Sequence, residues 1–291
     1  MGSLFSIFFP ALLVASASAA EASAPTQPQV TEVATHDLVQ HCRDTLVSLP
    51  GVHSAEVVSK VCLGAQRLPS CASVQGRQIF HLDQPSQRPG GRKILVFSVT
   101  HGDEPESGAL ARAWMERLAQ VDARNSWRVV PILNPDGLLA KSRVNANQVD
   151  LNRNFPTRDW EKNAVQFWKK HAGASPRRFP GKIPGSEPET QCAIHQIEDF
   201  NPDLIVSIHT PYGVLDFDGP PAPLPRVGKL PARRLGTFPG SLGRFMWNDR
   251  SVPVLTVELK GGPQPISPQD AQRLQDQLGD LALKVPARKS P

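Results

Sequence analysis

Short apolar runs rich in β-branched residues recur along the chain, and amphipathic stretches lie between most of them. Such runs are typical of buried strands, and predicted strands cover residues 57–62, 78–82, 94–100, 127–133, 204–208 and 252–259. In the amphipathic stretches the apolar residues have helical spacing, and predicted helices cover residues 36–48, 104–121, 186–200 and 268–283. Strands that alternate with helices predict an α/β fold built around a layered sheet.

Polar residues and prolines mark where several of these elements should begin. Residues 186–189, Ser-Glu-Pro-Glu, have the spacing of a capping box with proline in the first helical turn. Ser267 is the predicted N-cap of the last helix, followed by Pro268 at its first position. Residues 134–137, Asn-Pro-Asp-Gly, have the composition of a turn.

Residues 210–245 break the pattern, because they contain seven prolines, many glycines and several arginines. A long basic connection between two strands is either the border of an active site or a solvated loop. Its position directly after a strand-end histidine favours the border of an active site.

The N-terminus resembles a secretory signal peptide, with an apolar segment followed by small residues and an Ala-Ser-Ala sequence at 17–19. We expect residues 1–19 to be a signal peptide, 20–35 a flexible lead-in, and 36–291 a single domain. The apolar segment is shorter than the ~20 residues that a membrane span needs, although an uncleaved anchor is an alternative. The prediction is an exported protein without stable membrane insertion.

Charge and cysteine content narrow the possible functions further. The net charge of +5 is mild and no run of five Lys or Arg occurs, which argues against a nucleic-acid surface and suits small anionic substrates. The four cysteines are an even number, so disulfides are plausible in an exported chain, with three possible pairings. No Cys-x-x-Cys pair is present, which argues against a zinc–cysteine site.

Two histidines lie at predicted strand ends, where active sites of α/β proteins gather. His101 and Glu104 follow the strand at 94–100, and His209 follows the strand at 204–208. Two imidazoles and a carboxylate are a donor set that suits a catalytic zinc ion. The remaining histidines are interpreted as surface or helix-face residues: His36, His41, His53, His81, His171 and His195.

Other charged residues are candidates for catalysis and substrate binding. Glu258 lies in an apolar predicted strand, so it is either a general base beside a metal-activated water or a structural carboxylate paired with a cation. Asn152 and Arg153 offer a directional amide and a planar guanidinium to a carboxylate, and Arg143 is a second cation nearby. Surface salt bridges are the alternative interpretation of these arginines.

Together these motifs resemble the zinc metallocarboxypeptidases of the carboxypeptidase A type. The order and spacing match over roughly residues 90–285, in the motifs His101-x-x-Glu104, Asn134-Pro-Asp-Gly137, Arg143, Asp150-Leu-Asn-Arg153, Ser207-Ile-His209 and Thr256-Val-Glu258. Further motifs near residues 179–190, 214–220 and 239–243 resemble the bacterial branch of murein peptide amidases and D,L-carboxypeptidases. The resemblance implies an α/β three-layer sandwich, with a mixed, mostly parallel twisted sheet flanked by helices.

The resemblance also implies a role for each candidate residue. One Zn²⁺ ion would be bound by His101, Glu104 and His209, and the catalytic residues would be Glu258 as general base and Arg143 at the oxyanion. Asn152 and Arg153 would bind the C-terminal carboxylate of the substrate, and Asp150 would orient His101. We further hypothesise that Asp216 or Asp218 contacts the side-chain amine of diaminopimelate.

One feature departs from the family pattern. Carboxypeptidase A-type enzymes have a mobile tyrosine that closes over the substrate, whereas the one tyrosine of this chain, Tyr212, directly follows the His209 motif. Phe238 lies near the expected region but has no hydroxyl group. Substrate closure must therefore differ, although hydrolysis by zinc and Glu258 does not depend on it.

The expected function is a monomeric periplasmic zinc carboxypeptidase whose partner is a murein stem peptide, cut between γ-D-Glu and diaminopimelate. An alternative enzyme class is an N-acyl amino acid deacylase of the aspartoacylase or succinylglutamate desuccinylase type, which shares the His-x-x-Glu and Asp-Leu-Asn-Arg motifs. A non-enzymatic alternative is a periplasmic peptide-binding protein on an inactive peptidase scaffold. Retention of Glu258 beside the three ligand residues argues against that last alternative.

Overall fold

The structure is a computed structural model that describes residues 1–2, 36–220, 230–262 and 266–286. The predicted signal peptide and flexible lead-in fall, apart from residues 1–2, outside this part of the chain. Among the described helices none is both long and apolar enough to cross a membrane.

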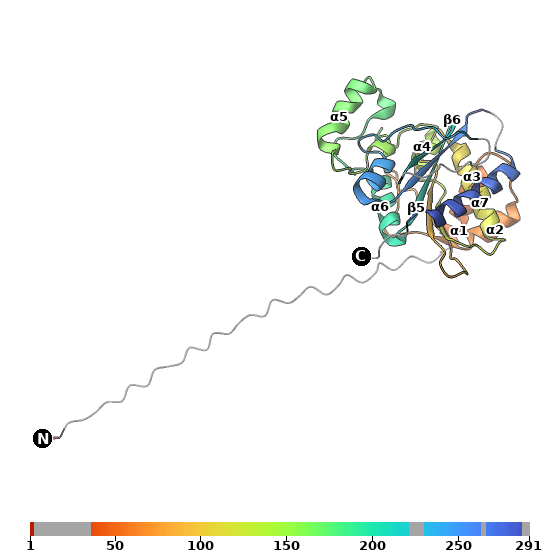
Figure 1. Ribbon diagram of the computed structural model, residues 1–291, viewed down its shortest axis with the longest axis horizontal. Helices are drawn as coiled ribbons and strands as arrows, with labels where there is room; N and C mark the ends of the chain where they lie inside the picture. Colours follow the sequence, from red (N-terminus) through yellow and green to blue (C-terminus); the bar gives the residue numbers. More distant parts are fainter. Residues whose placement is uncertain (3–35, 221–229, 263–265, 287–291) are drawn as a thin grey trace.

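A mixed sheet runs through the middle of the protein (Figure 1). It has seven strands in the order β1-β2-β4-β3-β5-β7-β6. The four neighbours β4, β3, β5 and β7 are parallel, whereas β1, β2 and β6 pair antiparallel at the edges. The strands are β1 (Ala65–Gln66), β2 (His81–Gln84), β3 (Lys93–Phe97), β4 (Ser126–Val130), β5 (Leu204–His209), β6 (Tyr212–Asp218) and β7 (Val254–Lys260). The parallel centre with antiparallel edges confirms the predicted fold class.

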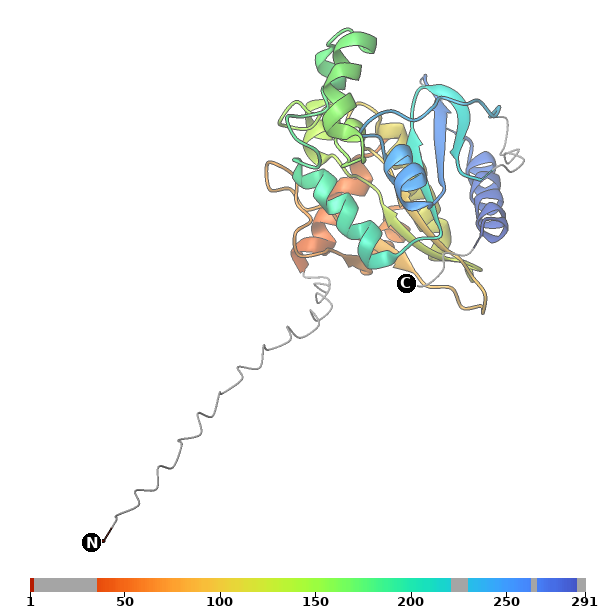
Figure 2. The ribbon, with the colours of Figure 1, turned by 60° about the vertical axis from the view of Figure 1, so that its left-hand side comes forward.

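Helices cover both faces of the sheet and complete three layers (Figure 2). One face packs on α1 (His36–Ser48), α2 (Ala55–Cys62), α3 (Pro105–Leu118) and α7 (Pro268–Lys284), and the other on α6 (Pro188–Phe200) and the π-helical turn η3 (Arg244–Asn248). The remaining elements are α4 (Pro135–Ala140), α5 (Trp160–His171) and the short 3₁₀ turns η1 (Leu151–Arg153) and η2 (Pro176–Arg178).

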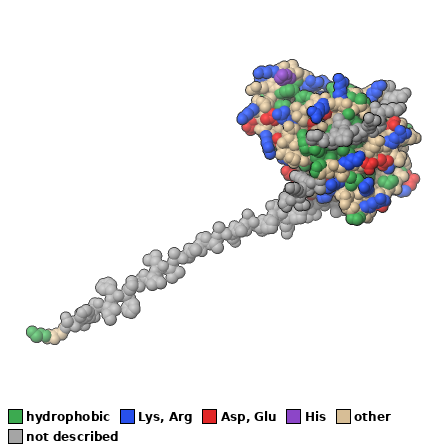
Figure 3. All heavy atoms as spheres, viewed as in Figure 1, with side chains coloured by type: hydrophobic (Ala, Val, Ile, Leu, Met, Phe, Trp, Pro, Cys, Tyr) green, Lys and Arg blue, Asp and Glu red, His purple; other side chains and the backbone are tan. Residues whose placement is uncertain are grey.

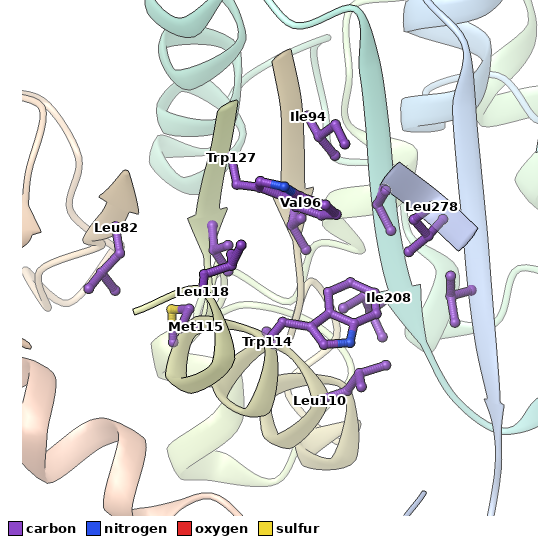
Figure 4. Packing of buried hydrophobic residues seen from close by; sticks show 14 of the residues in the cluster. Leu82, Ile94, Val96, Leu110, Trp114, Met115, Leu118, Trp127, Ile208 and Leu278 are labelled. Carbon is purple, nitrogen blue, oxygen red and sulfur yellow. The ribbon is translucent and has the colours of Figure 1, made fainter. Parts of the chain in front are cut away.

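Each central strand contributes side chains to two apolar cores, because successive residues of a strand point to opposite faces. In β3, Ile94 and Val96 belong to the core under α3 and α7, whereas Leu95 and Phe97 belong to the core under α6. Figure 4 shows the first core, in which Trp114 of α3 lies beneath the strands. The sheet is therefore packed on both faces, so residues at the ends of its strands are held in fixed positions.

The strand predicted at residues 57–62 is wrong, since this segment is helix α2. Its apolar residues Val58, Val61 and Cys62 recur with helical spacing and are all buried. Ser54 caps the helix by accepting a hydrogen bond from the Val57 backbone N–H. A short apolar run has no decisive periodicity, and here the cap and the packing favour the helix.

The predicted capping box at residues 186–189 is also wrong. Helix α6 begins at Pro188 with Glu187 as N-cap, and no side chain caps it. The Glu189 carboxylate instead accepts hydrogen bonds from the Val74 backbone N–H and the Asn145 amide. The predicted N-cap Ser267 is confirmed, because its hydroxyl accepts from the Asp270 backbone N–H.

Two segments predicted to be irregular contain regular structure. Asn134 caps the short helix α4, because its side chain accepts a hydrogen bond from the Gly137 backbone N–H. The basic segment 210–245 contains strand β6, which pairs antiparallel with β7 along the sheet edge. Other predicted elements occur at their expected places with different ends; the strand expected at 78–82, for example, is β2 (His81–Gln84).

The four cysteines form two disulfides, Cys42–Cys62 and Cys71–Cys192. The first joins α1 to α2, and the second joins the loop before β2 to α6. One histidine interpretation is wrong, because His81 is fully buried. Its Nδ1 atom accepts a hydrogen bond from the Gln196 side-chain amide, and burial, aided by the nearby Arg128, lowers its pKa to about 4.

Candidate active site

The first two candidate ligands follow a sharp change of direction after β3. Val99 has a left-handed backbone conformation with φ of 45°, which is strained for a β-branched residue and turns the chain away from the sheet. Gly102 then passes so close to the backbone of Gly137 that no side chain fits there. These constraints fix His101 and Glu104 at the carboxyl end of β3.

The next two strands place the other candidate residues at the same edge of the sheet. His209 is the last residue of β5, and Glu258 lies beside it in β7, since these two residues are register partners. Because β3, β5 and β7 are consecutive parallel strands, their carboxyl ends bring residues far apart in sequence to one place.

Three donor atoms converge at this place from β5 and the loop after β3. The Glu104 carboxylate lies 2.8 Å from His101 Nδ1 and 2.9 Å from His209 Nδ1, and the two Nδ1 atoms are 3.1 Å apart. All three side chains are buried, and in the described part of the chain they form the one group of such residues that can hold a metal ion. The structure therefore brings the three predicted ligands together.

The surroundings of the imidazoles fit a metal ion as well. Burial raises the pKa of Asp150, but Arg143 and His101 outweigh it and hold the pKa well below its usual range, so Asp150 is ionised. Its Oδ1 atom is 3.1 Å from His101 Nε2, and a carboxylate can only accept there. The hydrogen is thus on Nε2, and the lone pair on Nδ1 faces the other donors, which is the tautomer that a metal ligand needs. Ser207 is placed to accept in the same way from His209 Nε2, at 2.9 Å.

Arg143 lies beside the three candidate ligands. Its guanidinium donates to Asp150 Oδ2 through Nε and Nη2, at 3.1 and 3.0 Å, and its Nη1 is 3.5 Å from Glu104. One carboxylate thus holds both a ligand imidazole and a cation. The guanidinium is positioned to meet negative charge that develops beside the metal-binding group.

The pair Asn152 and Arg153 lies in η1, beyond Asp150. The Asn152 side-chain oxygen accepts from the Leu242 backbone N–H at 2.8 Å, which orients its NH₂ group. Arg153 donates to the Asn152 carbonyl at 2.7 Å and stacks on Phe238, 4.6 Å from the ring centroid. Burial lowers the pKa of Arg153, yet an arginine remains charged, so a cation is held ready for an anion.

Asp216 and Asp218 lie on β6, at the far side of Glu258. Asp216 is buried, which raises its pKa, and the backbone N–H groups of Leu235 and Phe217 oppose this shift. Burial, together with the neighbouring Asp216, raises the pKa of Asp218 to about 7. Both residues line the same cleft as the metal-binding group.

Glu258 is the carboxylate best placed for proton transfer. Burial and the charge of Glu104 raise its pKa, while His209 opposes the shift. The Tyr212 backbone N–H is 3.5 Å from its Oε2 atom, and no arginine or lysine in the described residues pairs with it. The absence of a cation partner in this part of the chain contradicts the alternative of a structural ion pair.

The candidate ligand, catalytic and substrate-binding residues line one cleft of about 680 Å³: His101, Glu104, Arg143, Asn152, Arg153, His209, Asp216, Asp218 and Glu258. Phe238 and the exposed Tyr212 also line it, so the one tyrosine of the chain lies in the cleft even though it is displaced from the family position in sequence. The described part of segment 210–245 does border the cleft, as predicted. Sequence reasoning missed Asp103 and the wall built from α5 and η2, including Trp168, Arg177 and Arg178. The only signal available for these was the pair of adjacent arginines.

Comparisons with known proteins agree with this geometry. Residues 67–216, about half of the chain, match the family described as zinc carboxypeptidase. Murein peptide amidase A of Vibrio campbellii is 32% identical over 198 residues, which cover 64% of this chain and 76% of that protein. Murein peptide amidase A of Escherichia coli K12 is 37% identical over 125 residues, but the match covers 42% of this chain and only 50% of that relative.

The fold is also similar to solved structures. The murein-tripeptide amidase MpaA from Escherichia coli O157 superposes with a TM-score of 0.54 and 27% identity, covering 78% of this chain and 93% of that one. The family model matches about half of this chain, and the match to the Vibrio campbellii amidase covers 76% of that relative. Two histidines and a glutamate also converge at the strand ends. This chain therefore belongs to the zinc carboxypeptidase family.

Proposed function

We propose that the protein is an exported, single-zinc carboxypeptidase that removes the C-terminal residue of a murein stem peptide. The observation that carries the proposal is the convergence of His101, Glu104 and His209 in a cleft that also holds Arg143 and Arg153. Glu258 lies beside this group and has no cation partner among the described residues. The matched relatives are murein peptide amidases, which supports a murein peptide as the substrate.

His101 Nδ1, His209 Nδ1 and the Glu104 carboxylate would hold the zinc ion. A zinc ion with this donor set polarises a carbonyl and acidifies water, to a pKa near 7 in known sites. The buried carboxylate of Asp150 keeps the His101 ring in the required tautomer.

The protein's own residues perform the remaining steps. Glu258 accepts a proton from the attacking water on one carboxylate oxygen and delivers it to the leaving amine nitrogen, which is general base followed by general acid catalysis. Arg143 stabilises the negative charge that develops on the carbonyl oxygen. Asn152 and Arg153 bind the free C-terminal carboxylate through the amide and the guanidinium, which aligns the bond to be cut.

The side chain of the released residue would point toward β6. Asp216 and Asp218 offer two carboxylates there, and an ammonium group between them would counter the burial and the repulsion from Asp216 that raise the pKa of Asp218. Diaminopimelate carries such an ammonium group on its side chain. Asp218→Asn should therefore raise KM for a diaminopimelate peptide more than for a peptide that ends in alanine.

The decisive experiment is incubation of the zinc-loaded protein with murein tri-, tetra- and pentapeptides, with products identified by mass. Release of diaminopimelate from the tripeptide supports the proposal, whereas cleavage of N-acyl amino acids alone supports the deacylase alternative. Glu258→Gln should abolish turnover, and the exposed Glu198→Gln on α6 is the matched control that should keep it. Turnover unchanged in Glu258→Gln contradicts the mechanism, and no turnover by the wild type supports a peptide-binding role.

Export to the periplasm is part of the proposal. The pairing of all four cysteines supports it, because disulfides persist in oxidising compartments. Cell fractionation of the full chain and of a chain lacking residues 2–19 tests it, together with the mass of the mature protein. A cytoplasmic, uncleaved full chain contradicts it.

A further inference from the structure

A separate wall of the cleft is built from α5 and η2. This part of the chain projects from the body of the protein in Figures 1 and 2, and Figure 3 shows Lys and Arg side chains on its surface. Between residues 158 and 182 the chain carries seven Lys or Arg residues and only two acidic ones. Of these cations, Arg177 and Arg178 line the cleft itself.

Arg177 is tied to the metal-binding end of the cleft. Its Nη2 atom donates to Asp103 Oδ2 at 2.6 Å, and Asp103 directly precedes the ligand Glu104. The second oxygen of Asp103 is buried and has no hydrogen-bond partner in the described residues. The carboxylate therefore holds Arg177 from one side and leaves the rest of its guanidinium free for a further acceptor.

Arg178 is a second cation of the cleft. No carboxylate of the described residues forms an ion pair with it, although it lies at the rim of the cleft. Its charge acts on Arg153: burial lowers the pKa of Arg153 most, and Arg143 and Arg178 lower it further. Three like charges that face one cleft repel each other, and this repulsion is relieved when the substrate brings more than one anion.

The strand order indicates which part of the substrate these arginines meet. Asp103 follows β3, whereas Asp216 and Asp218 lie on β6, and the order β3-β5-β7-β6 separates the two sides by three strand spacings. At about 4.8 Å per spacing this is about 14 Å, with His209 of β5 and Glu258 of β7 between the two sides. If the released residue faces β6, the residue before the bond to be cut lies toward β3, on the side of Arg177.

We propose that Arg177 and Arg178 bind a carboxylate carried by the substrate residue that precedes the bond to be cut. The proposal rests on the function proposed above and specifies its substrate further. A glutamyl residue that is linked through its side-chain carboxyl keeps a free, charged α-carboxylate. In an ordinary peptide residue the α-carboxyl group forms the peptide bond and is neutral. The two arginines would thus select γ-linked glutamyl peptides.

A pair of substrates isolates this interaction. The zinc-loaded full chain is assayed with a murein tripeptide that contains γ-linked D-glutamate and with the same tripeptide amidated to D-isoglutamine, which lacks only the α-carboxylate. The wild type should prefer the acid by about 10- to 100-fold in kcat/KM, which is the expected effect of losing a charge-assisted hydrogen bond. The lower kcat/KM for the amide should arise mainly from a higher KM.

Variants then assign the preference to the two arginines. Arg177→Gln and Arg178→Gln should slow cleavage of the acid, leave cleavage of the amide unchanged, and bring the ratio of the two toward one. Arg178→Lys should restore part of the preference, and Lys162→Gln, an exposed cation on α5, is the matched control. Thermal melts monitored by circular dichroism identify variants that fail to fold.

Two results overturn the proposal. One is equal cleavage of acid and amide by the wild type; the other is an equal loss on both substrates in the arginine variants, which indicates a purely structural role. If the wild type cleaves neither tripeptide and leaves the tetra- and pentapeptides intact as well, the proposed function itself is refuted, and with it the inference.

Discussion

Gly102 allows the ligand loop to approach α4, and replacing it with alanine tests how far the metal site depends on that approach. A Cβ atom at residue 102 would lie 1.9 Å from the Gly137 carbonyl carbon and 2.2 Å from the Leu138 backbone nitrogen. Carbon atoms in ordinary contact are about 3.5 Å apart, so the loop would have to move by about 1.5 Å. Ligand distances at a metal site are set within about 0.2 Å.

We therefore expect Gly102→Ala to lower zinc affinity by at least about 100-fold, the upper end of the effect of altered ligand support. Overpacking of this kind costs typically about 1–3 kcal/mol of stability, so the sheet should still fold. Zinc affinity is measured by competition with a chelating dye, and folding by circular dichroism. Gly64→Ala is the control, since a Cβ there meets only the Val61 carbonyl at 3.5 Å. A Gly102→Ala protein with the zinc affinity and turnover of the wild type would refute the reasoning.

Three further predictions concern the carboxylates and the disulfides. Asp150→Asn should weaken zinc binding by about 10- to 100-fold, because the amide no longer fixes the tautomer of His101; unchanged affinity in the dye assay would contradict this. The raised pKa of Asp218, about 7 against a usual 3.8, means that its contribution to stability is present below about pH 4 and is lost as the pH rises through 7. Calorimetry of Asp218→Asn should therefore show a melting temperature that falls less between pH 4 and 8 than that of the wild type, and parallel curves would refute the assignment. Replacing Cys71 and Cys192 by serine opens a closed loop with a sequence separation of 121 and should cost about 5 kcal/mol in denaturant unfolding, whereas a loss below 1 kcal/mol would show that the unfolded chain is not constrained by this bond.

The metal-binding group could be predicted from the sequence because its residues lie at the ends of segments that have a recognisable strand pattern. His101 and His209 each come at the end of a short, β-branched apolar run, which favours a buried strand, and buried parallel strands present their carboxyl ends at one edge. Glu258 was recognisable for a related reason, since a carboxylate within such a strand needs a function or a partner.

The elements that the sequence did not predict depend on tertiary packing. The run at 57–62 is equally apolar in strand or helix, and its helical state follows from burial of one face against the rest of the core. Strand β6 contains two aspartates and a glycine, so it forms because β7 offers it an unpaired edge. The cleft wall from α5 was beyond sequence reasoning as well, because Arg177 reaches Asp103 across 74 positions of the chain.

The double role of Asp150 has a thermodynamic consequence. One of its oxygens holds the ring of His101 and the other holds the guanidinium of Arg143, so a cation bound to the ring and an anion bound to the guanidinium both act on the same carboxylate. Linkage requires the effect to be reciprocal: if metal binding strengthens the affinity for an anionic ligand by some factor, the ligand strengthens the affinity for the metal by the same factor. With coupling of that sign, an enzyme built this way would bind its metal most tightly while an anionic ligand is bound, and would lose the metal to a chelator most readily when the cleft is empty.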